Sequence, residues 1–237
     1  MFGYYYGFDL TYIVLVLPCI LLAAIASANV NSTFKKFSKQ NSIRGITGAQ
    51  AAQRVLTMHG VRGVTITQVS GNLTDHYDPR TKVLRLSDAT YNSPSVAAIG
   101  VAAHECGHAI QHARGYAPLK LRSTLVPIAN FGAKIAWPLI LIGLLFTSES
   151  SSLFINLGII AFSGAVLFQL ITLPVEFNAS NRAIRMIADS GMMYGEEIVA
   201  ARKVLNAAAL TYVASAATAI LQLLRIILLT GGRRRND

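Results

Sequence analysis

The chain has 237 residues and a formal net charge of +10; 53% of its residues are hydrophobic and only 14% are charged. Soluble domains average about 25% charged residues, so this composition excludes an ordinary soluble domain and indicates membrane segments. The basic residues mostly flank apolar runs, as they do beside membranes, which argues against a nucleic-acid-binding protein with a basic, aromatic-rich face. Two cysteines provide no disulfide framework.

The first predicted element is an apolar stretch from about Leu10 to Val30, which meets the ~20 residues that a bilayer-spanning helix requires. The segment Ala26-Ser27-Ala28 also resembles a signal-peptide cleavage site, but no Lys or Arg precedes the apolar run. Three lysines follow it within residues 35–39. We therefore expect a retained anchor with its N-terminus outside and the following segment in the cytoplasm.

A polar, basic linker over residues 31–45 precedes a segment with α+β character. Gly48 to Met58 has helical spacing, with Gly60 as its stop. Val64–Val69 and Lys82–Leu86 alternate between apolar and polar residues and read as strands, with a polar loop at 73–81 between them. The second strand either offers a free edge to an extended peptide or pairs with the first strand as a hairpin, and both can hold together.

The most informative feature is the sequence His-Glu-Cys-Gly-His at residues 104–108, which reads H-E-x-x-H within an alanine-rich helical stretch. Residues four apart share one helix face, so His104 and His108 can hold one metal ion while Glu105 lies beside it. Zinc accepts imidazole ligands and lowers the pKa of water toward ~7, so that a carboxylate can take the proton. The alternative is a pair of hydrogen-bonded helix histidines without metal.

The helix that carries this motif has recognisable ends. Ser93 is the predicted N-cap, with Pro94 in the first turn, and Gly115 is the predicted stop. A helix of about 20 residues with this apolar composition requires burial. Burying two histidines and a glutamate on this helix costs free energy unless hydrogen bonds or a metal ion satisfy their polar atoms.

A catalytic zinc site needs a third protein ligand and one open position. Glu176 is the strongest candidate, ahead of His59 and His76, although it can also be a carboxylate at a helix N-terminus. His112 lies one turn beyond the motif and is interpreted as a residue near the ligands or the substrate. Cys106 points away from the ligand face and is interpreted as packing.

Three further apolar stretches meet the length of a membrane span: Leu125–Phe146, Leu153–Leu173 and roughly Leu205–Thr230. Pro174 could open a helix with Glu176 in its first turn, and the last stretch could continue a helix that begins near Gly195. The loop Thr147–Ser152 lacks Lys and Arg and is expected outside the cell, which places the motif helix in the cytoplasm. The basic run at 233–235 disagrees with this orientation if the last stretch spans fully.

Residues 91–111 and 174–180, together with 204–213 and the arginine-rich end, resemble the bacterial membrane-bound neutral zinc metallopeptidases called YugP-like, and the resemblance covers nearly the whole chain. More distantly, the chain is similar to HtpX-type and CAAX prenyl-protease metallopeptidases. In those proteins a glutamate on a later helix completes the site, which by resemblance assigns Glu176 as the third ligand. They carry Asp four residues after that glutamate, where this chain has Ser180.

The resemblance implies a zinc endopeptidase of the gluzincin type, with His104, His108 and Glu176 as ligands of one zinc ion per chain and Glu105 as general base. The residues expected to support the ligands or to contact the substrate are His112, Asn178, Ser180, Arg182, Tyr116 and Tyr194. Four of these, Tyr116, His112, Tyr194 and Arg182, are unranked candidates for stabilising the oxyanion.

The predicted fold is a mostly α membrane protein with about four transmembrane helices and a small α+β zincin-like cytoplasmic portion, which carries the HExxH helix and an edge-strand hairpin. The predicted segments are an anchor at 1–31, the zincin-like portion at 32–122, a transmembrane hairpin at 123–173, a helix with the third ligand at 174–204, and an apolar helix with a basic tail at 205–237.

The predicted function is hydrolysis of peptide bonds in membrane or membrane-proximal proteins at the cytoplasmic face of the bacterial inner membrane. The expected partners are therefore the lipid bilayer and a peptide or protein substrate, and no nucleic acid. The alternative is a zinc-binding membrane scaffold or chaperone-like protein without catalysis. The sequence does not determine the oligomeric state.

Overall fold

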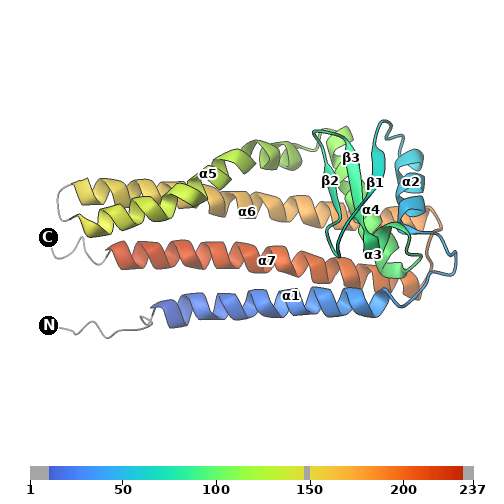
Figure 1. The fold of residues 1–237 in the computed structure, drawn as a ribbon, viewed down its shortest axis with the longest axis horizontal. Helices are drawn as coiled ribbons and strands as arrows, with labels where there is room; N and C mark the ends of the chain where they lie inside the picture. The colour runs from blue at the N-terminus through green and yellow to red at the C-terminus, as the bar shows by residue number, and fades with distance from the viewer. Residues whose placement is uncertain (1–10, 147–149, 232–237) are drawn as a thin grey trace. The chain divides into compact units, whose positions relative to one another are not determined.

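The computed structural model describes residues 11–146 and 150–231, and these are mostly helical with one small sheet (Figure 1). The chain forms two compact units. One unit holds residues 1–25, 122–171 and 212–237, and the other holds residues 26–121 and 172–211. The predicted external loop Thr147–Ser152 lies partly outside the described residues, and the basic run at 233–235 lies wholly outside them.

Four helices are long and apolar enough to cross a membrane. The first, α1 (Leu17–Phe37), follows a π-helical turn at Tyr12–Val16. The others are α5 (Ala117–Leu145), α6 (Ser150–Asp189) and α7 (Glu196–Gly231). The prediction of four apolar spans is confirmed at this level of length and composition, and α7 begins directly after Gly195, as expected.

The expectation that Pro174 opens a new helix is wrong, because α6 runs through it as one helix of 40 residues. A proline inside a helix removes one backbone hydrogen bond, but packing of the flanking turns can hold the helix together. Val175 and Ala179 are fully buried on either side of Glu176, which anchors this part of α6.

The second unit contains α2 (Gly48–Met58), α3 (Asp88–Tyr91) and α4 (Val96–Ala113), together with β1 (Thr65–Val69), β2 (His76–Asp78) and β3 (Val83–Ser87). Thr47 caps α2 through a capping box with Gln50, and Gly60 follows the helix with a positive φ of 67°. Helix α2, its glycine stop and the two predicted strands are therefore confirmed, with shifts of one residue at the strand ends.

The sheet has the strand order β1-β3-β2, which corrects the predicted pairing. β1 and β3 are parallel, with Ile66 beside Leu84, so they do not form a hairpin. The hairpin partner of β3 is β2, which lies in the segment expected to be a loop. Because β3 is the central strand, it has no free edge. The alternation in residues 82–86 showed a strand but could not show how many neighbours it has.

The motif helix α4 begins later than expected, because Ser95 and not Ser93 is its N-cap. The Ser95 hydroxyl accepts a hydrogen bond from the Ala98 amide at 3.2 Å, and the Ser93 hydroxyl donates to Ser95 at 3.0 Å. Gly115 follows the helix with a positive φ of 64°, as predicted.

The core of the second unit surrounds α4, whose residues Ala103, Cys106 and Ile110 are buried. Helix α6 approaches α4 closely at Gly107, where a Cβ atom would lie 2.8 Å from the carbonyl oxygen of Ala179. Only a residue without a side chain permits this approach. The glycine within the motif therefore sets the spacing of the two helices.

Gly107→Ala is expected to force α4 and α6 apart and to lower the free energy of unfolding by about 1–3 kcal/mol. Thermal unfolding of the purified protein in detergent measures this loss. Gly164→Ala is the matched control, because a Cβ there meets nothing within 4 Å. Equal midpoints for Gly107→Ala and the wild type would contradict the close helix contact.

Candidate metal centre

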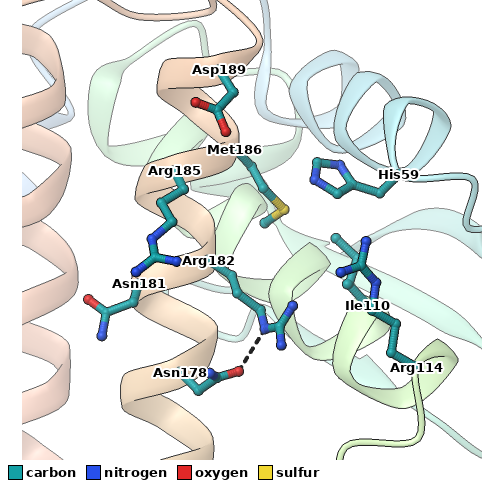
Figure 2. Close-up of a pocket in the computed structure, with 9 residues that line it drawn as sticks. All are labelled: His59, Ile110, Arg114, Asn178, Asn181, Arg182, Arg185, Met186 and Asp189. Carbon is teal, nitrogen blue, oxygen red and sulfur yellow. Dashed lines mark hydrogen bonds between the residues drawn. The ribbon is translucent and has the colours of Figure 1, made fainter.

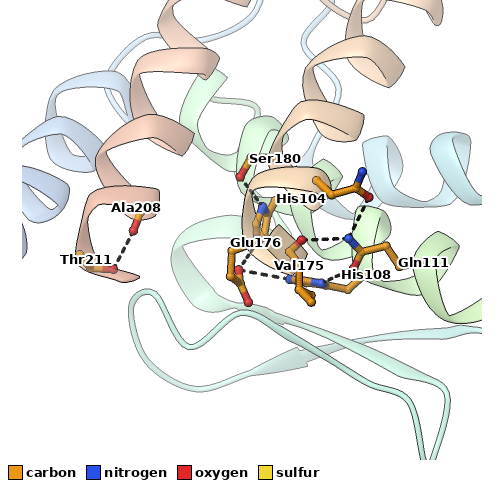
Figure 3. Close-up of polar contacts among 9 residues, drawn as sticks. His104, His108, Gln111, Val175, Glu176, Ser180, Ala208 and Thr211 are labelled. Atoms are coloured by element: carbon orange, nitrogen blue, oxygen red, sulfur yellow. Dashed lines mark hydrogen bonds and ion pairs between the residues drawn. The ribbon is translucent and has the colours of Figure 1, made fainter. Parts of the chain in front are cut away.

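Three side chains converge between α4 and α6. His104 and His108 project from successive turns of α4, and Glu176 reaches them from α6 (Figure 3). The Nε2 atoms of His104 and His108 lie 3.3 Å and 3.5 Å from Oε2 of Glu176. One ligand atom from each residue lies within 4.8 Å of the others. The structure thus brings together the three residues that the sequence analysis selected as a ligand set.

The spacing of these atoms suits a zinc ion. Zinc bonds of about 2.0–2.2 Å in a tetrahedral arrangement place neighbouring ligand atoms about 3.3–3.6 Å apart, and both histidine–glutamate distances fall in this range. Two imidazoles and one carboxylate are also ligands that zinc accepts. The residues present therefore fit the metal.

Gln111 fixes the orientation of His108. Its Nε2 donates to the Val175 carbonyl at 2.9 Å and to Oδ1 of Asn178 at 3.0 Å, so its Oε1 is the atom that faces Nδ1 of His108 at 3.0 Å. Nδ1 of His108 must then carry the proton that it donates. In the neutral ring this leaves the lone pair on Nε2, which points at the metal position.

Sequence reasoning did not select Gln111. Its position three residues after His108 could have identified it as a neighbour of that ring, since residues three apart share a helix face. The side chain is fully buried, and a buried amide requires partners for its polar atoms.

Ser180 supports the other histidine. Its hydroxyl lies 3.1 Å from Nδ1 of His104. The hydroxyl oxygen can accept a hydrogen bond from Nδ1–H and so direct Nε2 of His104 to the metal position, but it supplies no negative charge.

A proton competes with a metal ion at His108. Burial alone disfavours the charged ring, but hydrogen bonding and attraction to Glu176, with smaller contributions from Glu105 and Gln111, outweigh it and raise the pKa of His108. A raised pKa means that the ring binds a proton more readily as the pH falls. Metal retention is therefore expected to weaken toward acidic pH.

Glu105 lies one residue beyond His104 and is 8% exposed. Within the described chain its carboxylate makes no hydrogen bond or ion pair, and its oxygen atoms are not among the fully buried ones, so they remain accessible to water or substrate. Cys106 differs from it, since its thiol donates to the Ala52 carbonyl at 3.6 Å and burial raises its pKa well above the usual value. Cys106 is thus a neutral packing residue.

His112 lies one turn beyond His108, and its Nδ1 is 2.9 Å from the hydroxyl of Tyr77 on β2. Tyr77 was missed because its segment was expected to be a loop. The other candidates lie elsewhere: Tyr194 accepts a hydrogen bond from Arg44, and Nε of Arg182 donates to Asn178. Within the described residues, the Tyr116 side chain makes no hydrogen bond with the three convergent residues.

The alternative third ligands are not part of the cluster. His59 caps α2, with Nδ1 at 3.0 Å from the Val55 carbonyl, and His76 lies on β2 with Nδ1 at 2.8 Å from the Thr74 carbonyl. The cluster of possible metal ligands found among the described residues contains Glu176 instead.

Comparison with known proteins agrees with these features. The model of a family described as "Putative neutral zinc metallopeptidase" matches residues 12–231. The chain is 46% identical over 226 residues to "Putative membrane protease YugP" of Bacillus subtilis (strain 168), which covers 95% of this chain and 99% of that protein. No solved structure matches the chain. The resemblance inferred from the sequence motifs is confirmed.

Gln111→Met is expected to keep the packing volume but to release His108, weakening zinc retention by about 10- to 100-fold. Mass spectrometry after dialysis against graded chelator concentrations measures the bound metal. Gln53→Met, at an exposed site on α2, is the control. Equal retention in both variants would show that Gln111 does not support the ligand.

Proposed function

Because the chain belongs to the zinc metallopeptidase family described above, we propose that it is a membrane-bound zinc endopeptidase. It hydrolyses peptide bonds of membrane or membrane-proximal proteins. The observation that carries this proposal is the convergence of His104, His108 and Glu176, in which both histidine–glutamate distances match tetrahedral ligand spacing.

In this proposal the two histidines and Glu176 hold one zinc ion, in the manner of a gluzincin. Three protein ligands leave the fourth position of a tetrahedral ion open to water or substrate, which distinguishes catalytic from structural zinc sites. Gln111 and Ser180 hold the imidazole rings so that both Nε2 atoms face the ion. When bound, zinc polarises the substrate carbonyl and lowers the pKa of water.

Glu105 is the general base. Its carboxylate takes a proton from the attacking water while the water oxygen bonds to the carbonyl carbon of the substrate. When the carbon–nitrogen bond breaks, Glu105 delivers that proton to the leaving amine. Its burial and its lack of hydrogen-bond partners within the described chain support this role.

His112 is the favoured donor for the oxyanion among the four candidates. It lies on the same side of α4 as His108, and the hydroxyl of Tyr77 holds its Nδ1. Its Nε2 is then available to the substrate. Tyr194 and Arg182 are engaged with other residues, which makes them weaker candidates.

A peptide substrate would meet the sheet at β2 and not at β3. β2 is an edge strand, and within the described residues it pairs only with β3. An edge strand can hold an extended peptide by main-chain hydrogen bonds. Tyr77 of β2 contacts His112, so a peptide added to this edge would run beside the proposed metal.

The site is proposed to face the cytoplasm of a bacterial cell. Lys35, Lys36 and Lys39 directly follow the first apolar span, and basic residues near span ends favour the cytoplasmic side.

The metal is tested first. Wild-type protein purified in detergent is expected to hold about one zinc ion per chain, and His104→Ala is expected to lose it, because two remaining ligands bind weakly. Mass spectrometry of the bound metal makes the measurement. His76→Ala, an exposed histidine on β2, is the matched control. Well-folded wild type without zinc would refute the proposal.

Glu105→Gln is expected to retain zinc but to lower the rate of peptide hydrolysis by about 100- to 10,000-fold, since the amide cannot accept the proton. Cleavage of a quenched-fluorescent peptide library measures the rate. Glu196→Gln, at an exposed carboxylate in the first turn of α7, is the control. A wild type that binds zinc but cleaves no peptide, and whose protein partners persist in Glu105→Gln, would favour the scaffold alternative.

A further inference from the structure

A basic pocket lies beside α4 and α6. It has a volume of about 320 Å³ and is lined by residues of α4 and α6 and by His59 (Figure 2). Its three arginines are Arg114, at the end of α4, and Arg182 and Arg185 on α6. All of these residues belong to the second unit.

The positive charges of this pocket are not neutralised within the described chain. Asp189 is the one carboxylate in the lining, and none of the three guanidinium groups forms an ion pair with it. Arg114 and Arg185 are exposed, and their side chains make no hydrogen bond or ion pair with the described residues. Figure 2 shows Arg114 and Arg182 extending into the space between α4 and α6. Such a grouping favours an anion.

The pocket is separate from the proposed catalytic face. Residues two apart on a helix point about 200° apart. Asn178 therefore points away from the direction of Glu176, and Ile110 of the pocket points away from that of His108. An anion in this pocket does not lie beside Glu105, which argues against a terminal carboxylate of the cleaved peptide as its occupant.

A chain of hydrogen bonds joins the pocket to a proposed metal ligand. Nε of Arg182 donates to Oδ1 of Asn178 at 2.7 Å. The same oxygen accepts from Nε2 of Gln111 at 3.0 Å, and Oε1 of Gln111 accepts from Nδ1 of His108 at 3.0 Å. Restraining Arg182 therefore restrains the amide that orients His108.

We propose that this pocket binds a phosphate group and that its occupancy strengthens metal retention at His108. A phosphate group, whether free or in a lipid, carries a full negative charge and terminal oxygens that guanidinium groups bind in pairs, which suits a pocket with three arginines. The group belongs either to an anionic phospholipid or to phosphate in solution. The pocket residues of α6 begin five positions after the apolar run 153–173, which favours the lipid head group.

The first test measures binding of inorganic phosphate to the purified protein in detergent by calorimetry. The double variant Arg114→Gln/Arg185→Gln is expected to bind at least about tenfold more weakly than the wild type, since two of three charged donors are lost. Arg62→Gln, at an exposed arginine outside the pocket, should bind as the wild type does. His104→Ala should also bind normally, because the anion contacts arginines and not metal.

The second arm distinguishes the source of the phosphate. Native mass spectrometry of protein released from nanodiscs of phosphatidylcholine, with or without phosphatidylglycerol, counts the retained lipid. Retention of phosphatidylglycerol that the double variant loses assigns the pocket to a lipid head group. Binding of inorganic phosphate without lipid retention assigns it to phosphate in solution. No binding in either arm, or the same loss in Arg62→Gln, would overturn the proposal.

The coupling between the anion pocket and the metal is tested by measuring how much zinc the protein retains in the presence of a chelator. Added phosphate or phosphatidylglycerol should increase retention in the wild type and leave it unchanged in the double variant. Binding of the anion without this change would overturn the coupling. Neither binding arm requires catalysis or zinc, so the anion site can stand even if the proposed peptidase activity fails.

Discussion

The close contact between Gly107 of α4 and the backbone of α6 at Ala179 is the constraint on which the candidate centre depends. A side chain at Gly107 would separate the helices, and the histidine–glutamate distances of 3.3 Å and 3.5 Å would grow with them. The glycine therefore has a role that the H-E-x-x-H pattern does not express. It lets a carboxylate from a helix distant in sequence reach two histidines that are one turn apart.

The same approach creates a buried polar network around the ligands. Gln111 is fully buried and uses its amide group to join His108, the Val175 carbonyl and Asn178. Asn178 in turn accepts from Arg182. A satisfied network of this kind holds its members in one arrangement. It also connects the basic pocket to a proposed metal ligand through hydrogen bonds, so that a change at Arg182 can affect His108.

Local signals predicted the features that depend on one segment alone. Apolar runs of membrane length predicted four spans, and helical spacing with Gly60 as its stop predicted the bounds of α2. The same signals failed where the structure depends on contacts with residues distant in sequence. Pro174 reads as a helix start, but packing carries α6 through it. The alternation of residues 82–86 predicts a strand, yet its central place and its parallel partner follow from pairing with distant residues.

The sequence by itself determined the composition of a membrane protein, a helix that presents His104 and His108 on one face, and membership of a family through long matching segments. Helical periodicity suffices for these because each is a property of consecutive residues. Only the tertiary structure decided that Glu176 meets both histidines, that Gln111 and Ser180 hold them, and that Tyr77 supports His112. Those contacts join residues from different elements, and their distances arise from helix and sheet packing that no local pattern records.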